Sequence, residues 1–214
     1  MKNNIQTAIE EALNSAPERK FTESVEISFN LKDIDLKNPA NRIQEEIRLP
    51  NGRGKPVKIA MFASGEMATK ARAAGIDIID PSTIEDLGGN RQQARKLANS
   101  IDFFLAEIPH MGTVGRVLGV VLGPRGKMPR PVPPALDPAM IAATLKDTAV
   151  VRSRDRMTFH SPIGSREQSL DELTDNAFAI WRRVTGKLER GAGNIRSCYV
   201  KTSMGPAIKV VVIE

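Results

Sequence analysis

The chain has 214 residues, 41% of them hydrophobic, so it can bury one large core or two modest ones and is not expected to be disordered. Lys and Arg number 31 against 25 Asp and Glu; this net charge of +6 favours a polyanionic partner without proving one. The single cysteine excludes an intrachain disulfide and a cysteine-rich zinc site, and the lack of an apolar run of about 18 residues or a signal-peptide core predicts a cytoplasmic protein without membrane association.

Two elements are predicted near the N-terminus. Apolar residues at helical spacing, from Ile5 to Leu13, predict a short amphipathic helix over 3–14. In 25–31, apolar residues alternate with Glu26, Ser28 and Asn30, which predicts a strand with one packed face and one solvated face.

The middle of the chain has a different pattern. Unbroken apolar runs at 57–62, 76–80 and 101–106 are separated by stretches of helical character. Strands that are buried on both faces lose their alternation, so this order predicts a parallel βαβ sheet covered by helices, with Asp137 and Pro138 opening its last helix. We therefore expect a Rossmann-like α/β domain over residues 56–151.

After residue 151 the alternating pattern returns. Ser169 and Glu172 form a capping box for an amphipathic helix, and two strands are predicted at 195–202 and 207–213, across a turn at Gly205-Pro206. The N-terminal piece cannot bury a core alone, so its natural partner is the C-terminal piece. The predicted fold class is α/β (α+β) with two domains: a discontinuous antiparallel-sheet domain of residues 1–55 and 152–214, and the inserted domain.

The two crossings between these domains are expected near 51–55 and 151–154. The first crossing is built of the turn residues Pro50-Asn51-Gly52-Arg53-Gly54, so a hinge there is plausible, and a rigid interface remains the alternative.

Catalytic chemistry is hard to assemble from this sequence. His110 and His160 stand alone, without metal-ligand spacing, so neither a metal nor another cofactor is predicted. The glycine-rich stretch 122–130 departs from a nucleotide-binding loop, since Val121 stands where the first glycine belongs and Met128 replaces the Ser or Thr that would hold magnesium. An exposed basic surface and a plain proline-stiffened connection are equally good interpretations of this stretch.

The turn at 201–206 points to RNA instead. Met204 could present an apolar side chain, Ser203 a hydroxyl and Gly205 a backbone that a ligand can approach, and such groups meet ribose hydroxyls and splayed bases. Glu26 and Ser28 would lie near the same edge if their strand shares the sheet. An ordinary turn with a core methionine, and a solvated Glu26, are the alternatives.

Four segments carry a resemblance to a known family. They are 20–26 (KFTESVE), 122–129 (LGPRGKMP), 160–164 (HSPIG) and 196–206 (RSCYVKTSMGP). Together they span almost the whole chain, and in this order they resemble the ribosomal protein L1 (L-one) family, in its archaeal form.

The resemblance implies a non-enzymatic stalk protein of the large ribosomal subunit, monomeric when free. Its discontinuous domain would grip rRNA, its inserted domain would face exit-site tRNA, and the free chain would repress its own mRNA. The implied RNA-binding residues are Lys20, Phe21, Glu26, Ser28, Ser197, Thr202, Ser203, Met204 and Gly205, with a secondary basic loop of Arg125, Lys127 and Arg130. Ser203 stands where relatives often carry Thr, and Ser28 where they can carry a basic or imidazole group, which makes Ser28 the least secure contact. A nucleotide-using enzyme is the alternative from a different class.

Overall fold

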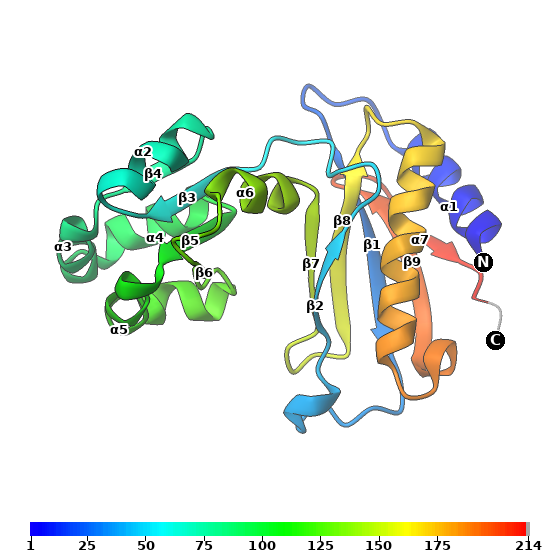
Figure 1. Cartoon of the computed structure of the whole chain (residues 1–214). Coiled ribbons are helices and arrows are strands. Elements are labelled where there is room, and N and C mark those ends of the chain that lie inside the picture. The colour runs from blue at the N-terminus through cyan, green and yellow to red at the C-terminus, as the bar shows by residue number, and fades with distance from the viewer. Residues whose placement is uncertain (213–214) are drawn as a thin grey trace. The chain divides into compact units, whose positions relative to one another are not determined.

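The computed structural model describes residues 1–212, which fall into two compact units (Figure 1). Unit 1 consists of Met1–Lys55 together with the chain from Asp147 onward, and unit 2 is Pro56–Lys146. One unit contains an antiparallel sheet and the other a parallel sheet, so the predicted fold class is confirmed.

The main sheet of unit 1 joins both ends of the chain. Its strands are β1 (Ser24–Leu31), β8 (Thr158–Ser165), β9 (Ile195–Thr202) and β10 (Ile208–Val210), in the order β10-β9-β1-β8 and all antiparallel. Glu26 lies opposite Lys201, and Ser28 opposite Tyr199. The prediction that the two terminal segments share a sheet is therefore confirmed; the last residue of the predicted strand 207–213 lies outside the described residues.

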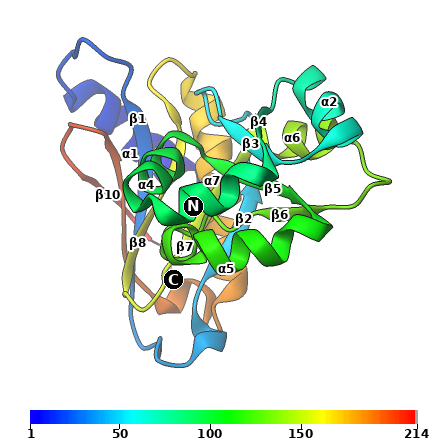
Figure 2. The same ribbon diagram turned by 90° about the vertical axis from the view of Figure 1, so that its left-hand side faces the viewer.

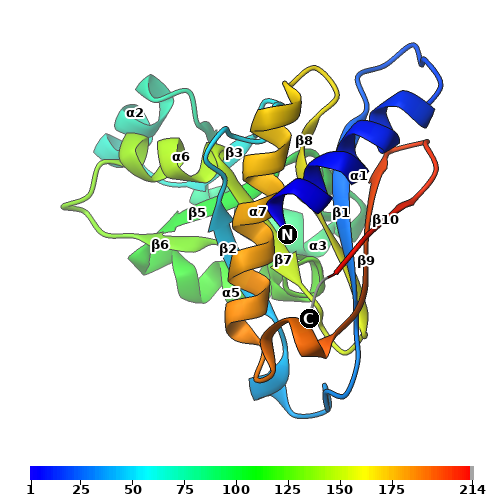
Figure 3. The same ribbon diagram turned by 90° about the vertical axis from the view of Figure 1, so that its right-hand side faces the viewer.

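Two helices cover one face of this sheet. They are α1 (Lys2–Ser15) and α7 (Leu170–Lys187), and Figure 3 shows both lying across the strands. The inward residues of β1 are fully buried against them, and the Phe29 ring lies 6.0 Å from that of Trp181. The predicted capping box opens α7, since the Ser169 hydroxyl and the Glu172 carboxylate each accept from the other residue's amide. The polar residues of β1 are left on the opposite, solvated face.

A two-stranded ladder completes unit 1. β2 (Gln44–Arg48) pairs antiparallel with β7 (Thr148–Arg152), so the chain returns to unit 1 before β7 begins. The predicted boundary at 151/152 falls within this strand, before its last residue. Residues 148–151 (TAVV) continue the apolar style of the middle segment, and only their pairing with β2 distinguishes them from it.

The first crossing is hydrogen-bonded to unit 1. The Asn176 side chain accepts from the Asn51 amide at 3.0 Å and donates to the Gly52 carbonyl at 2.8 Å. Gln168 donates to the Asn51 carbonyl at 2.9 Å, and Gly54 has a φ of +65°, a conformation that suits glycine. These hydrogen bonds hold Asn51 and Gly52 against unit 1.

Unit 2 is a parallel sheet between two layers of helices. Its strands are β3 (Ile59–Phe62), β4 (Asp77–Ile79), β5 (Phe103–Glu107) and β6 (Arg130–Val132), in the order β4-β3-β5-β6. The helices are α2 (Gly65–Ala73), α3 (Ile84–Gly89), α4 (Arg91–Ser100), α5 (Ile108–Arg125) and α6 (Pro138–Lys146). Figures 1 and 2 show α2 and α6 on one face of this sheet and α4 and α5 on the other.

Short 3-10 turns occur at η1 (Pro39–Asn41), η2 (Pro81–Thr83) and η3 (Gly191–Asn194). Across residues 1–212, none of the helices combines the length and the apolar character that crossing a membrane requires.

Candidate nucleic-acid interface

The start of β1 and the end of β9 lie side by side. The Ser203 amide donates to the Ser24 carbonyl at 2.9 Å, and the Ser203 hydroxyl accepts from the Ser24 amide at 3.1 Å. Because β1 and β9 run antiparallel, this pairing brings residues 20–24 next to residues 203–205, about 180 positions later in the chain. Most of the predicted RNA-binding residues come from these two segments.

Two large apolar side chains are exposed here. Phe21 is 54% exposed and Met204 is 61% exposed, although side chains of this size are usually buried. An exposed ring and a thioether can stack on or pack against unpaired bases, which present apolar faces. The pair makes this end of unit 1 chemically suited to single-stranded or splayed nucleotides.

Three cations flank these apolar groups. Arg19 and Lys20 are exposed beside Phe21, and Lys55 donates from its ammonium to the Thr22 carbonyl and the Ser24 hydroxyl, both at 2.9 Å. A shallow groove of about 430 Å³ runs along this edge, lined by Arg19, Lys20, Phe21, Thr22, Arg166 and Glu167. We call the surface formed by residues 19–22, Ser24, Lys55 and 203–205 the strand-end surface. Such cations favour phosphate.

Lys55 was not among the predicted RNA-binding residues. It precedes the inserted unit and has no periodic relation to β1, so only the folded chain brings it to Ser24.

A buried carboxylate lies beneath the turn. The Glu23 side chain is 1% exposed, accepts from the Met204 amide at 2.9 Å and forms a 2.9 Å ion pair with Arg166. Burial alone would raise the pKa of Glu23, but the hydrogen bonds from the Met204 amide and the Thr202 side chain, together with the hydrogen bond and charge of Arg166, leave that pKa below its usual value. Neither Glu23 nor Arg166 was predicted, because a single acidic residue before a strand carries no signal of its distant partner.

Gly205 is needed by the fold itself. A Cβ on this residue would lie 2.4 Å from the Thr202 hydroxyl oxygen and 3.0 Å from the Ala16 Cβ. The lack of a side chain at Gly205 therefore lets the turn pack closely against the end of α1. The prediction gave a different reason for this glycine, namely that a ligand can approach its backbone.

The prediction for Thr202 needs correction. This residue is 0% exposed, so its side chain presents no surface to a partner. It packs under the turn rather than contacting a ligand.

The remaining predicted residues lie along the solvated face of the main sheet. Glu26, Ser28 and Ser197 are half-buried on it. Two of their hydroxyls already have partners: Ser28 donates to the Phe159 carbonyl at 3.3 Å, and Ser197 accepts from the Asn30 amide group at 2.8 Å. Glu26 faces solvent opposite Lys201 and is the more available group.

The secondary basic loop is mostly structural. Residues 122–125 form the last turn of α5, and the loop begins only at Gly126, whose φ of +69° ends the helix. Lys127 donates to the carbonyls of Ala98 and Ile101 at 2.9 and 2.5 Å, so it caps the end of α4. Arg125 is therefore the last residue of α5 and Arg130 the first residue of β6, with Lys127 in the connection between them.

The arginines of this loop are likewise engaged. Arg125 donates to the Asn99 side chain at 3.2 Å, and the Arg130 guanidinium lies 5.4 Å from the centre of the Phe103 ring. These contacts favour the interpretation as a stiff connection over that of a free basic surface.

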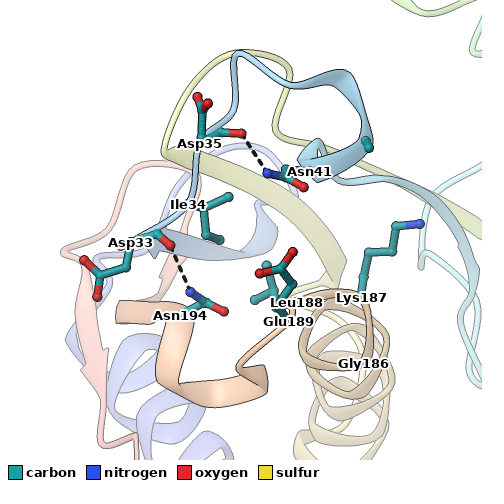
Figure 4. Close-up of a pocket in the computed structure, with 10 residues that line it drawn as sticks. Asp33, Ile34, Asp35, Asn41, Gly186, Lys187, Leu188, Glu189 and Asn194 are labelled. Carbon is teal, nitrogen blue, oxygen red and sulfur yellow. Dashed lines mark hydrogen bonds between the residues drawn. The ribbon is translucent and has the colours of Figure 1, made fainter.

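A separate pocket lies at the opposite end of β1 (Figure 4). It has a volume of about 250 Å³, and its polar lining groups are partly used by the local backbone, since Asn194 and Asn41 donate to the carbonyls of Asp33 and Asp35 at 3.4 and 3.0 Å. Within the described residues no three His, Cys, Asp or Glu side chains are grouped to hold a metal.

Cys198 is not a reactive thiol. It is buried in the main sheet, and burial raises its pKa to about 12, so it is protonated at neutral pH.

Comparison with known proteins identifies relatives over nearly the full chain. The model of the "Ribosomal protein L1p/L10e family" matches residues 4–206. Among similar proteins, that of Thermoplasma acidophilum is 50% identical over 208 residues, covering 97% of this chain and 96% of the relative. The Archaeoglobus fulgidus protein is 46% identical over 211 residues, covering 98% of each chain, and the Methanothermobacter thermautotrophicus protein is 43% identical over 212 residues, covering 99% of this chain and 100% of the relative. All three are described as large ribosomal subunit protein uL1.

Proposed function

Because this chain belongs to the ribosomal protein L1p/L10e family, we propose that it binds large-subunit rRNA through the strand-end surface of unit 1 as a structural component of the ribosome. The family is structural and non-enzymatic, so the alternative of a nucleotide-using enzyme is rejected. The observation that carries the proposal is the pairing of two exposed apolar side chains, Phe21 and Met204, with three flanking cations at one end of a sheet.

Each kind of group has its own part in such binding. The ammonium and guanidinium groups of Arg19, Lys20 and Lys55 attract phosphates and give an affinity that falls with salt. The Phe21 ring and the Met204 side chain contact bases, whereas the Ser203 hydroxyl and the Glu26 carboxylate accept hydrogen bonds from sugar or base amino groups and contribute specificity. None of these steps requires turnover.

The test uses the full chain and large-subunit rRNA of Thermoplasma acidophilum, whose own protein is 50% identical. Equilibrium binding is measured for the wild type, for the double variant Phe21→Ala with Met204→Ala, and for Met140→Ala. Met140 is a comparably exposed methionine in unit 2, at 67%, and serves as the matched control. We expect the double variant to lose on the order of 100-fold in affinity, at about 1–3 kcal/mol for each lost base contact, and the control to bind as the wild type does. Equal losses in both variants, or a wild type that binds no better than to unrelated RNA, would reject the proposal.

The family resemblance also leads us to propose that the free chain represses its own mRNA and that unit 2 faces exit-site tRNA. A messenger that folds like the rRNA site would use the same strand-end surface, so the two RNAs should compete for one site. Addition of excess rRNA should then displace a bound messenger leader, and simultaneous binding of both would reject this part. The free chain is proposed to be a monomer, which sedimentation measures directly.

A further inference from the structure

The ion pair between the buried Glu23 and the half-buried Arg166 lies directly beneath the Met204 turn. Each oxygen of the Glu23 carboxylate has one main partner: Oε1 accepts from the Met204 amide and Oε2 from the Arg166 guanidinium, both at 2.9 Å. The Arg166 amide also donates to the Glu23 carbonyl at 2.9 Å, so the two residues are joined through backbone and side chain. A carboxylate that is 1% exposed cannot contact a partner of the size of RNA, so its influence on binding must pass through its neighbours.

Arg166 fixes the other side of this arrangement. Its guanidinium donates to the carbonyls of Leu13, Ala16 and Pro17 at 3.4, 3.1 and 3.1 Å, where α1 ends. These carbonyls carry the partial negative charge of a helix C-terminus, and α1 has no basic residue of its own in its last turn. One arginine therefore ties the end of α1 to the carboxylate that holds the turn.

This network meets the strand-end surface at both of its exposed apolar groups. Met204 is held through its own amide, and Phe21 lies two residues before Glu23 on the same segment. A turn that is already fixed before RNA arrives loses less conformational entropy on binding, which strengthens the complex without an added contact. An ion pair that contains a buried carboxylate is, by contrast, weak grounds for a purely stabilising role, because the desolvation of the carboxylate offsets much of the attraction.

We propose that Glu23 and Arg166 are positioning residues, which hold the Met204 turn and the Phe21 segment in the conformation that binds RNA. This inference rests on the proposed function and deepens it, since it names what preforms the site. It predicts that removal of the carboxylate charge weakens RNA binding in a protein that is still fully folded.

The decisive variant is Glu23→Gln. Glutamine keeps the size of the side chain but replaces one acceptor oxygen with a donor group, so it can accept from the Met204 amide or from Arg166 but not from both. The matched control is Glu45→Gln, because Glu45 is also largely buried, at 15%, and is paired with Arg183 at 2.7 Å between β2 and α7, away from the turn. Affinity for Thermoplasma acidophilum large-subunit rRNA is measured at a temperature where melting curves show every variant to be folded.

We expect Glu23→Gln to weaken binding about tenfold, the scale of one lost charge-assisted hydrogen bond, and Glu45→Gln to leave it unchanged. If Glu23 acts through Met204, the combined variant with Met204→Ala should lose less than the product of the two separate losses. A wild-type affinity for Glu23→Gln, an equal loss in the Glu45→Gln control, or a combined loss equal to the product would overturn the inference.

A second measurement needs no RNA. Hydrogen exchange of the Met204 amide should be slow in the free wild type and at least about tenfold faster in Glu23→Gln, because the amide loses its acceptor. Should Glu23→Gln fail to fold, Arg166→Lys replaces it. Lysine keeps the positive charge but cannot donate to the Glu23 carboxylate and to three carbonyls together, so the Met204 amide should exchange faster and RNA should dissociate faster. Unchanged hydrogen exchange of the Met204 amide in a folded variant would overturn the positioning role. A wild type that binds no rRNA would instead defeat the proposed function, and the exchange result alone would then decide whether Glu23 and Arg166 hold the turn.

Discussion

Lys55 and Ser24 are 31 positions apart in the chain, yet the Lys55 ammonium donates to the Ser24 hydroxyl at 2.9 Å. The same ammonium donates to the Thr22 carbonyl, so the last residue of the N-terminal part of unit 1 is fastened to the strand-end surface. A cation in this place adds to the attraction for phosphate that Arg19 and Lys20 supply.

Lys55→Gln should therefore weaken rRNA binding at low salt and reduce the slope of log affinity against log salt concentration by about one unit, as expected for one lost phosphate contact. Lys58→Gln is the control, because Lys58 is exposed in unit 2 only three positions away. A salt series with both variants checks this. An unchanged slope for Lys55→Gln would mean that this ammonium serves only the Ser24 and Thr22 contacts.

The second prediction concerns Gly205. Gly205→Ala should lower the free energy of unfolding by about 1–3 kcal/mol, because the new methyl group would overlap the Thr202 hydroxyl and press on Ala16. Gly112→Ala is the contrasting variant: apart from the neighbouring backbone of its own helix, nothing lies within 4 Å of a Cβ placed there, and alanine in a helix is favoured over glycine by about 1 kcal/mol. Denaturant titrations should thus show shifts of opposite sign, and a neutral Gly205→Ala would contradict the packing described for the turn.

The third prediction follows from the pKa of Glu23. Since its folded-state pKa is lowered, the ionised form contributes stability that is fully present above the ordinary value of 4.5 and is lost as the pH falls through the lower, folded-state pKa. Glu23→Gln lacks this titration. The difference in melting temperature between the wild type and Glu23→Gln should be largest near neutral pH and should shrink below pH 4.5. A difference that grows on acidification would contradict a lowered pKa of Glu23 in the folded state.

The fourth prediction concerns Cys198. Because burial raises the pKa of this thiol to about 12, a thiol reagent at neutral pH should leave the folded chain unmodified and should label it rapidly in denaturant. Labelling rates with increasing denaturant then report the unfolding of the main sheet. Rapid modification of the native protein would show that β9 opens readily.

Much of unit 1 is predictable because periodicity reports burial. The alternation in 25–31 identifies the packed and the solvated faces of β1, and the shortage of core in the N-terminal piece requires a partner from the C-terminal piece. The predicted site residues Phe21, Ser203 and Met204 come together for the same reason, since they flank two strands that pair.

What escaped prediction depends on contacts between distant positions. β7 is apolar in the manner of unit 2, and only its pairing with β2 assigns it to unit 1. Gly123 and Pro124 suggest a loop, yet they continue the last turn of α5 because Gly126 ends that helix in a left-handed conformation. The contacts of Glu23, Arg166 and Lys55 are with residues remote in sequence, and no local sequence pattern predicts such contacts.

The ladder between β2 and β7 has a consequence for how the molecule can be rebuilt. Just beyond it, the Leu49 amide donates to the Asp147 carbonyl at 2.8 Å, so the strand that departs toward the insert and the strand that comes back from it are neighbours. A gene that omits Pro56–Lys146 and joins Lys55 to Asp147 through a short linker would thus encode a continuous, self-contained version of unit 1. The loop-closure entropy of such a connection would be small, because Leu49, six residues before Lys55, is already hydrogen-bonded to Asp147.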